Sequence, residues 1–169
     1  KDLNSFIYDR ISNFFKDQGY AALDIEAVLA IDSGLICEIP KRLNAIKEFS
    51  QLPESKDLAS ANKRVGNILK KADFKFALKV DTTLLKDIAE VNLHQALDLV
   101  DAEARKEYLT NNYSGSLKLL CKLKNPIDQF FNDVMVNVDD ESLKMNRLAL
   151  LEKLYSAMNL VADLSKLSS

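Results

Sequence analysis

Apolar residues recur every three or four positions along nearly the whole chain, the spacing that places side chains on one face of an α-helix. No stretch keeps the two-residue alternation of a half-buried strand for long. With 4 glycines and 3 prolines in 169 residues, few positions interrupt helices. The pattern therefore predicts an all-α fold, a helical bundle of about eight helices.

The first half of the chain reads as a series of helices separated by turn residues. An apolar stripe begins at Leu3 and ends before Gly19, a residue type that favours helix C-termini. Asp24 is expected to cap a short helix, and Pro40 suits the first turn of the next. A further helix follows Pro53. The apolar positions are Leu3, Phe6, Ile7, Ile11, Phe14 and Phe15 in one stripe; Ile25, Val28 and Leu29; Leu43, Ile46 and Phe49, which are expected to point inward; and Leu58, Ala61, Val65, Ile68, Leu69 and Ala72 on one side of their helix.

The second half carries the longest predicted helix, from about residue 88 to residue 109. Residues 74–81 before it read as irregular, with Thr82 or Thr83 able to cap a short turn. Residues 111–115 are expected to end this long helix. The remaining predicted helices carry Leu117, Leu119, Leu120 and Leu123; Ile127, Phe130, Phe131 and Val134 after Pro126; and, from near Ser142, Leu143, Leu148, Leu151, Leu154, Tyr155, Met158 and Val161.

A shift in composition at residues 51–55 predicts a boundary within the chain. Residues 1–52 read as a small helical unit or the tail of an upstream domain, and residues 53–169 as a helical bundle. The chain starts without a methionine and shows no signal-peptide pattern, so we expect it to be a piece of a longer protein.

The composition is that of a folded protein, with 47% hydrophobic and 28% charged residues. No apolar run approaches the roughly 20 residues that a membrane-spanning helix needs. Cys37 and Cys121 belong to no CxxC or Cys/His cluster. Two free thiols in a reducing cytoplasm are the favoured interpretation, although the sequence leaves a disulfide open.

Residues that carry catalysis are scarce. There is no phosphate-binding loop, no dinucleotide-binding glycine motif, and no zinc-protease or serine-hydrolase motif. His94 reads as a surface or half-buried helix residue rather than a general base. Asp139, Asp140 and Glu141 resemble a metal-ligand cluster, but acids in front of a helix more often cap it. We therefore predict no catalytic residue and no metal site in this chain.

Positive charge is concentrated in one block. Residues 41–80 hold 10 basic residues against 4 acidic ones, a net charge of +6. Because the whole chain carries −2, the remaining residues sum to −8. A basic block in an acidic protein is a typical footprint of a polyanion partner, although it is sometimes only a solvated face.

The string at residues 61–69 is the most informative part of this block. On a helix, Val65 and Ile68 point inward, and donor side chains lie on the exposed side. Such donors suit RNA phosphates and base edges, and a solvated face with Asn67 or Arg64 in a structural hydrogen bond is the alternative. Gly66 inside a helix suggests the close approach of RNA or of a packed helix. The predicted exposed set is Asn62, Lys63, Arg64, Gly66, Asn67, Lys70 and Lys71.

A second group of candidates lies near the last helix. Arg147 and Lys144 can bind phosphate, but Arg147 can equally pair with a nearby aspartate. Phe130, Phe131 and Met135 are expected to be core residues, with the alternative that one exposed aromatic ring stacks on an unpaired base.

Two separated strings resemble one family, the β subunit of the bacterial two-subunit glycyl-tRNA synthetase. They are ANKRVGNIL at residues 61–69 and NPIDQFFNDVMV at residues 125–136, the latter followed by Asp139-Asp140 and NRLALL at residues 146–151. Looser similarity covers FIYDR at residues 6–10 and DIEAVLA at residues 24–30. The resemblance implies a helical anticodon-binding domain of the DALR type at the C-terminal end of that subunit. The literal Asp-Ala-Leu-Arg string is absent, and residues 146–151 stand nearest to it.

The resemblance also implies partners and a set of binding residues. The family's β subunit binds tRNA-Gly and assembles with a catalytic α subunit as a cytoplasmic heterotetramer of two α and two β subunits. The α subunit uses ATP and magnesium to attach glycine, so no cofactor is expected in this chain. A protein-interaction scaffold, docking through the apolar N-terminal helix, is the alternative. The predicted RNA-binding residues are Lys63, Arg64, Asn67, Lys70, Lys71, Lys41, Arg42, Lys144 and Arg147.

Overall fold

The computed structural model describes residues 3–31, 36–72 and 79–168, and the side chains from residue 7 onward within these ranges. Within these ranges the chain forms α-helices and short 3₁₀ helices and no strand, which confirms the predicted all-α fold. The helices of the first half are α1 (Leu3–Asp17), α2 (Ala22–Leu29), the 3₁₀ helix η1 (Ile36–Glu38), α3 (Ile39–Phe49) and α4 (Ser55–Lys71).

The second half contains the longest helix, and its predicted limits are confirmed. The elements are η2 (Thr82–Leu84), α5 (Ile88–Leu109), α6 (Tyr113–Leu120), η3 (Cys121–Leu123), α7 (Lys124–Asp133), α8 (Glu141–Met158) and η4 (Leu164–Leu167). No helix in the described ranges is long and apolar enough to cross a membrane. The irregular segment predicted at residues 74–81 lies mostly outside the described residues.

Local signals explain most of the helix ends. Gly19 ends α1 with a φ of 86°, a left-handed conformation that costs glycine little. Pro40 lies in the first turn of α3, as predicted. The expected cap at Asp24 is wrong, because α2 begins at Ala22 and Asp24 lies inside its first turn. The break predicted at residues 111–115 is present at Asn111 and Asn112, but α6 already begins at Tyr113, and the Asn112 side chain caps it by accepting the N–H of Gly115.

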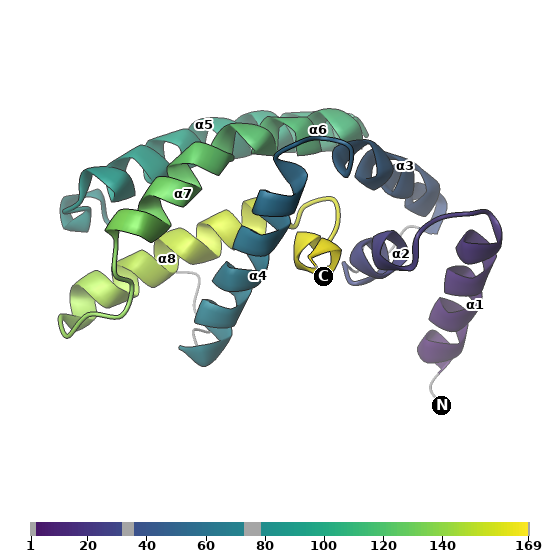
Figure 1. Ribbon diagram of the computed structural model, residues 1–169, viewed down its shortest axis with the longest axis horizontal. Helices are drawn as coiled ribbons and strands as arrows, with labels where there is room; N and C mark the ends of the chain where they lie inside the picture. Colours follow the sequence, from purple (N-terminus) through teal and green to yellow (C-terminus); the bar gives the residue numbers. More distant parts are fainter. Residues whose placement is uncertain (1–2, 32–35, 73–78, 169) are drawn as a thin grey trace.

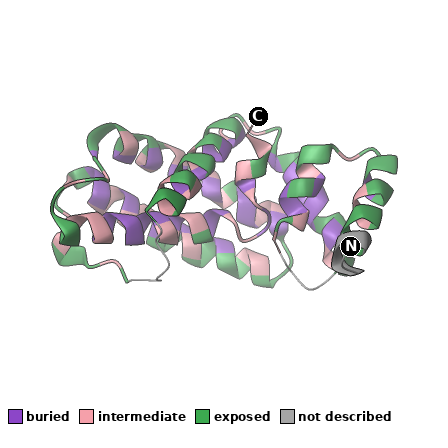
Figure 2. Ribbon diagram, turned by 90° about the horizontal axis from the view of Figure 1, so that it is seen from below, coloured by how far each residue is buried: buried purple, intermediate pink, exposed green. Residues whose placement is uncertain are grey.

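The helices pack into an elongated molecule (Figure 1). Helices α5, α6 and α7 follow one another along one long side, and α4 and α8 lie against them from below. The short η4 lies between α4 and α2 and contacts both. Figure 2 shows buried positions along the inner faces of these helices, and the buried residues form one hydrophobic cluster that extends from Phe15 to Leu164.

Residues before and after the predicted boundary near residue 52 are packed together. Helix α3 contacts α6, and α2 contacts η4. A backbone hydrogen bond of 2.8 Å joins the N–H of Asp163 to the carbonyl of Ala27. The boundary falls in the turn between α3 and α4, and the division into domains at this turn stays a prediction.

Helix α1 lies at one end of the molecule, beyond α2 (Figure 1). Phe15 is buried and meets the rings of Phe14 and Tyr20 edge-on. Phe14 itself is 57% exposed, and Ile7 and Tyr8 are also exposed on this helix. The described part of α1 therefore leaves apolar surface open, as the scaffold alternative predicts.

Candidate nucleic-acid interface

Helix α4 presents a row of donor side chains to solvent. Its inward positions are Leu58, Ala59 and Val65, which are buried against the rest of the bundle. Ile68 and Leu69 are half-buried and pack on the same core. The opposite side is exposed, as the helical spacing predicts, and carries Lys63, Arg64, Asn67, Lys70 and Lys71. Their contact with RNA stays a prediction.

Asn62 was predicted to be exposed with this row, and that prediction is wrong. Its side chain is completely buried and pairs with the amide of Asn159, at the end of α8, through hydrogen bonds of 2.8 Å and 3.2 Å. The Oδ1 of Asn159 also accepts the N–H of Leu164 over 3.0 Å. The pair therefore joins α4, α8 and η4, because a buried amide requires partners for its polar atoms.

Gly66 faces a packed helix. A Cβ at this position would lie 3.1 Å from the Cε2 atom of Tyr155 on α8. Of the two explanations that the sequence suggested for Gly66, the structure supports the packed helix. Burial raises the pKa of the Tyr155 hydroxyl, and the negative charge of the nearby Asp163 raises it further.

A groove of about 840 Å³ opens beside the exposed face of α4. Arg64 and Lys71 line it from α4, and Lys144 lines it from α8. The guanidinium carbon of Arg64 lies 4.0 Å from the centre of the Phe131 ring, the geometry of a cation–π contact. The remaining lining residues are Ile68, Ala72, Asn132, Asp133, Val134, Met135, Val136, Asn137 and Leu148.

A second hollow of about 390 Å³ lies on the other side of the same residues of α4. It is lined by Ser60, Lys63, Arg64, Asn67, Ile68, Lys71 and Ser168. The Nζ of Lys63 donates to the carbonyl of Ser168 over 3.2 Å at its rim. Three of its lining residues are cationic and none is acidic, so the hollow suits an anion.

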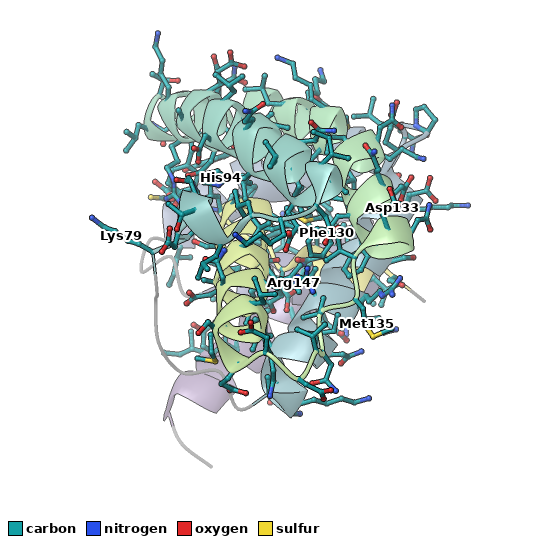
Figure 3. All side chains as sticks on the ribbon, turned by 90° about the vertical axis from the view of Figure 1, so that its left-hand side faces the viewer. Lys79, His94, Phe130, Asp133, Met135 and Arg147 are labelled. Carbon is teal, nitrogen blue, oxygen red and sulfur yellow. The ribbon has the colours of Figure 1, made fainter. Side chains whose placement is uncertain are left out.

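Arg147 was predicted as a phosphate contact, and the structure corrects this. It is buried between α8 and α5 (Figure 3), where its Nε donates to Glu90 over 2.7 Å and its Nη2 to Asp87 over 2.8 Å. Its Nη1 donates to the carbonyl of Met135 over 2.8 Å. Its donors are occupied inside the protein, so Arg147 is a structural residue. The sequence left this alternative open, with other aspartates as the predicted partners.

Arg42 was also predicted as a phosphate contact, and it is 1% exposed. Its guanidinium donates to the carbonyl of Val161 over 3.1 Å, to Glu38 over 3.0 Å and to the Tyr108 hydroxyl over 2.7 Å. The rings of Tyr108 and Tyr113 flank it. Arg42 therefore joins α3, α5 and the segment after α8, and no phosphate can reach it in this packing.

Two other predicted cations remain accessible. Lys144 is half-buried, pairs with Glu141 over 3.4 Å and lines the groove. Lys41 is exposed on α3 and lines neither hollow. The structure thus gathers Arg64, Lys71 and Lys144 around the groove and leaves Lys41 and Lys70 outside it.

Two expectations about the segment between α7 and α8 have different outcomes. Asp140 caps α8 by accepting the N–H groups of Ser142 and Leu143, as predicted. Phe130 is buried as predicted, but Met135 is 72% exposed, so its assignment to the core is wrong. Figure 3 shows Met135 projecting from the edge of the molecule. Met135 follows the end of α7 and leaves the helical spacing on which the prediction relied.

Other candidates are ordinary structural residues. His94 is half-buried and lies 3.5 Å from Asp98 one turn along α5. Cys37 and Cys121 are free thiols, the favoured interpretation. Among the residues that the structure describes, no group of three or more His, Cys, Asp or Glu side chains is arranged to hold a metal ion.

One contact that shapes this region has no signal in the amino-acid sequence. The amide of Asn146 pairs with the backbone of Asp81, accepting its N–H over 2.8 Å and donating to its carbonyl over 3.0 Å. This contact attaches the segment before α5 to the start of α8. Nothing in the local pattern around Asn146 points to a partner 65 residues away.

Residues 58–164, from the first turns of α4 to the start of η4, match the DALR anticodon binding domain. The chain belongs to this family of helical RNA-binding domains.

The chain is also similar over nearly its whole length to subunits of one ligase. It is 51% identical over 167 residues to the glycine–tRNA ligase beta subunit of Dechloromonas aromatica, covering 99% of this chain and 24% of that protein. It is 49% identical to the subunit of the same name from Methylobacillus flagellatus and 46% to that from Nitrosomonas europaea, with 99% of this chain covered in both and 24% and 23% of those proteins. The chain thus spans about a quarter of the length of these relatives.

Proposed function

We propose that this chain is the anticodon-recognition region of a glycine–tRNA ligase β subunit. The observation that carries the proposal is the anticodon-binding family match over residues 58–164, which contains α4 and its row of exposed donors. The similarity to glycine–tRNA ligase β subunits supports tRNA-Gly as the RNA. The hollows beside Arg64 offer cations for phosphates and amide and carboxylate groups for a base.

In the whole assembly the chemistry belongs elsewhere. We expect a catalytic α subunit that attaches glycine to tRNA-Gly with ATP and magnesium, a heterotetramer of two α and two β subunits, and a location in the cytoplasm. The described residues of this chain carry no enzyme motif, and the chain needs no cofactor for the role that we propose. Its contribution is to bind the far end of the tRNA and so to orient the acceptor end.

Anticodon recognition requires that cytosines be read. Glycine codons begin with two guanines, so the matching anticodons carry two adjacent cytosines. An unpaired cytosine offers an N4 donor together with N3 and O2 acceptors. The interface therefore needs both donors and a carboxylate or carbonyl, and the residues around α4 and the end of α7 supply both kinds.

The test is binding of this chain to tRNA-Gly and to a variant with both anticodon cytosines changed, across a salt series. We expect the variant to bind more weakly at every salt concentration, because base readout adds to the phosphate contacts. Equal, salt-sensitive binding of both RNAs would contradict anticodon recognition and leave a non-specific backbone contact.

A scaffold role is the second candidate, and one observation favours it. Ile7, Tyr8 and Phe14 are exposed on α1, at the end of the molecule farthest from α8 and the groove. We expect this surface to contact another part of the synthetase. If the chain binds neither RNA, and replacing Phe14 with serine weakens its association with the rest of the synthetase, scaffolding is its main role.

A further inference from the structure

The exposed ridge of α4 separates two hollows of different chemistry. Arg64, Ile68 and Lys71 line both of them, so the two spaces lie back to back across one strip of helix surface. The smaller hollow adds Lys63, and no acid lines it. The larger groove adds an aromatic ring, amides and one carboxylate. A ligand that crosses the ridge would therefore need an anionic part on one side and a flat polar part on the other.

The groove has the composition of a site for a base. Phe131 is half-buried under the Arg64 guanidinium, and the exposed Met135 lies a few residues further along the same wall. These groups offer flat and polarizable surface for a ring. A volume of about 840 Å³ is within the range of small-molecule sites, so it can hold one nucleoside.

The polar side chains of the groove are available for a ligand. Asn132, Asp133 and Asn137 are exposed, and their side chains make no hydrogen bond or ion pair with any residue in the described part of the chain. Asp133 is the acidic residue among those that line the groove. Figure 3 shows Asp133 at the end of α7, on the same edge of the molecule as Met135. A carboxylate on the wall of a groove is a natural acceptor for an amino group of a ligand.

We propose that one unpaired cytosine nucleotide lies across the Arg64–Lys71 ridge, with its phosphate in the cationic hollow and its base in the groove, where Asp133 accepts a hydrogen bond from the N4 amino group. This inference rests on the proposed anticodon recognition and assigns its specificity to Asp133. The neighbouring amides of Asn132 and Asn137 are the donors for N3 and O2 of the base.

The chemistry distinguishes cytosine from uracil at one atom. A carboxylate accepts from the N4 amino group of cytosine, whereas uracil presents the O4 acceptor at the same place and repels it. An asparagine at position 133 can donate to O4 or accept from N4, so it would lose this discrimination. Asp133 is exposed at the last residue of α7, and its replacement by asparagine removes no internal contact among the described residues.

The experiment uses an anticodon stem-loop RNA of tRNA-Gly and two derivatives, each with one anticodon cytosine changed to uracil. Binding is measured by fluorescence anisotropy for the wild-type chain and for Asp133→Asn. The matched control is Asp139→Asn, which changes the charge equally at an exposed residue of the nearby loop that lines neither hollow. Circular dichroism of the variants checks that the helices are intact.

We expect the wild-type chain to prefer cytosine at one position by roughly 10-fold or more, the size of one good base contact. Asp133→Asn should remove most of that preference, and Asp139→Asn should keep it. A Lys63→Gln change should weaken the binding of all three RNAs by the same factor, because Lys63 lines the cationic hollow and not the groove.

Two results would overturn the inference. If the wild-type chain prefers cytosine and Asp133→Asn keeps the full preference, Asp133 is not the reader, while anticodon recognition stands. If the wild-type chain shows no preference between the three RNAs, both this inference and the proposed anticodon recognition fail.

Discussion

The Nε of Arg147 donates to Oε1 of Glu90 over 2.7 Å, and both side chains are buried in the middle of the bundle. The other carboxylate oxygen of Glu90 accepts the N–H groups of Lys86 and Asp87 at the start of α5. Through its Nη1, Arg147 also holds the carbonyl of Met135 at the rim of the groove. One buried ion pair thus joins α5, α8 and the wall of the proposed base site (Figure 3).

Replacing Arg147 with methionine is expected to destabilise the fold by about 3–5 kcal/mol, because it leaves the buried Glu90 carboxylate without its partner. Urea unfolding followed by circular dichroism measures the change. Lys144→Met is the control: its exposed pair with Glu141 contributes little, so a loss of less than about 1 kcal/mol is expected. Equal losses in the two variants would contradict the structural role of Arg147.

The amide pair of Asn62 and Asn159 gives a second stability prediction. We expect Asn62→Ala to lower the free energy of unfolding by about 1–3 kcal/mol, because it removes buried hydrogen bonds and leaves polar atoms of Asn159 without partners. Asn67→Ala, on the exposed side of the same helix, should change it by less than about 0.5 kcal/mol. Thermal and urea unfolding of the three proteins checks the order.

Salt dependence tests which lysines meet phosphates. The logarithm of the RNA-binding constant falls linearly with the logarithm of the salt concentration. If Lys63 and Lys71 each neutralise one phosphate, replacing either with glutamine should make this slope shallower by about 0.7–0.9. Lys106, exposed on α5 and outside both hollows, is the matched control and should leave the slope unchanged. A common slope for all these variants would show that phosphates are contacted elsewhere.

Acid should weaken the cluster around Arg42. The hydrogen bond from Arg42, helped by the Tyr113 hydroxyl, lowers the pKa of Glu38 below its ordinary value. A carboxyl whose pKa is lower in the folded state stabilises the fold above its unfolded pKa of about 4.3 and loses that contribution as the pH falls through its folded pKa. Glu38→Gln should therefore be less stable than wild type at pH about 7, and the difference should shrink below pH about 4. A difference that stays constant with pH would contradict this account.

The two thiols should react at different rates. Cys37 is exposed, whereas Cys121 is half-buried. Burial raises the pKa of the Cys121 thiol, and the negative charge of the nearby Glu54 raises it further. Because the thiolate is the reactive form, Cys121 should react with a maleimide or disulfide reagent more slowly, on the order of tenfold. Mass spectrometry of partly labelled protein distinguishes the sites. Cys37→Ser should leave only the slow phase, and a remaining fast phase would contradict the assignment.

Local signals allowed much of the fold to be predicted. The three- and four-residue spacing identified the helices, and residues such as Pro40, Gly19 and Asp140 marked their ends correctly, because capping depends on neighbours in the chain. The caps predicted at Asp24 and at Thr82 or Thr83 are misplaced for a common reason. In each case the helix begins earlier: α2 begins at Ala22, and Asp81 caps η2 by accepting the N–H of Thr83.

The candidate site was predicted less evenly. The exposed positions on α4 follow from helical spacing; they are Lys63, Arg64, Asn67, Lys70 and Lys71. Whether a long cationic side chain is exposed or buried also depends on which acceptor groups of other helices lie close to it. Arg42 and Arg147 look like Lys71 in the sequence, yet carboxylates and carbonyls from distant segments bury them. Asn62 lies on the same stripe of α4 as the buried Leu58 and Val65, whereas Asn67 lies on the exposed side, and the tertiary structure adds the partner Asn159 that the buried amide needs.

By itself, the sequence determined the all-α class, the limits of α5 and the basic, donor-rich face of α4, because these features depend on spacing and charge within one segment. Only the tertiary structure decided which cations are free, which residue faces Gly66, and that Arg64 lies over Phe131 beside a groove containing Asp133. These facts are contacts between α4, α7 and α8, and their energies depend on geometry that residues far apart in the chain acquire only on packing.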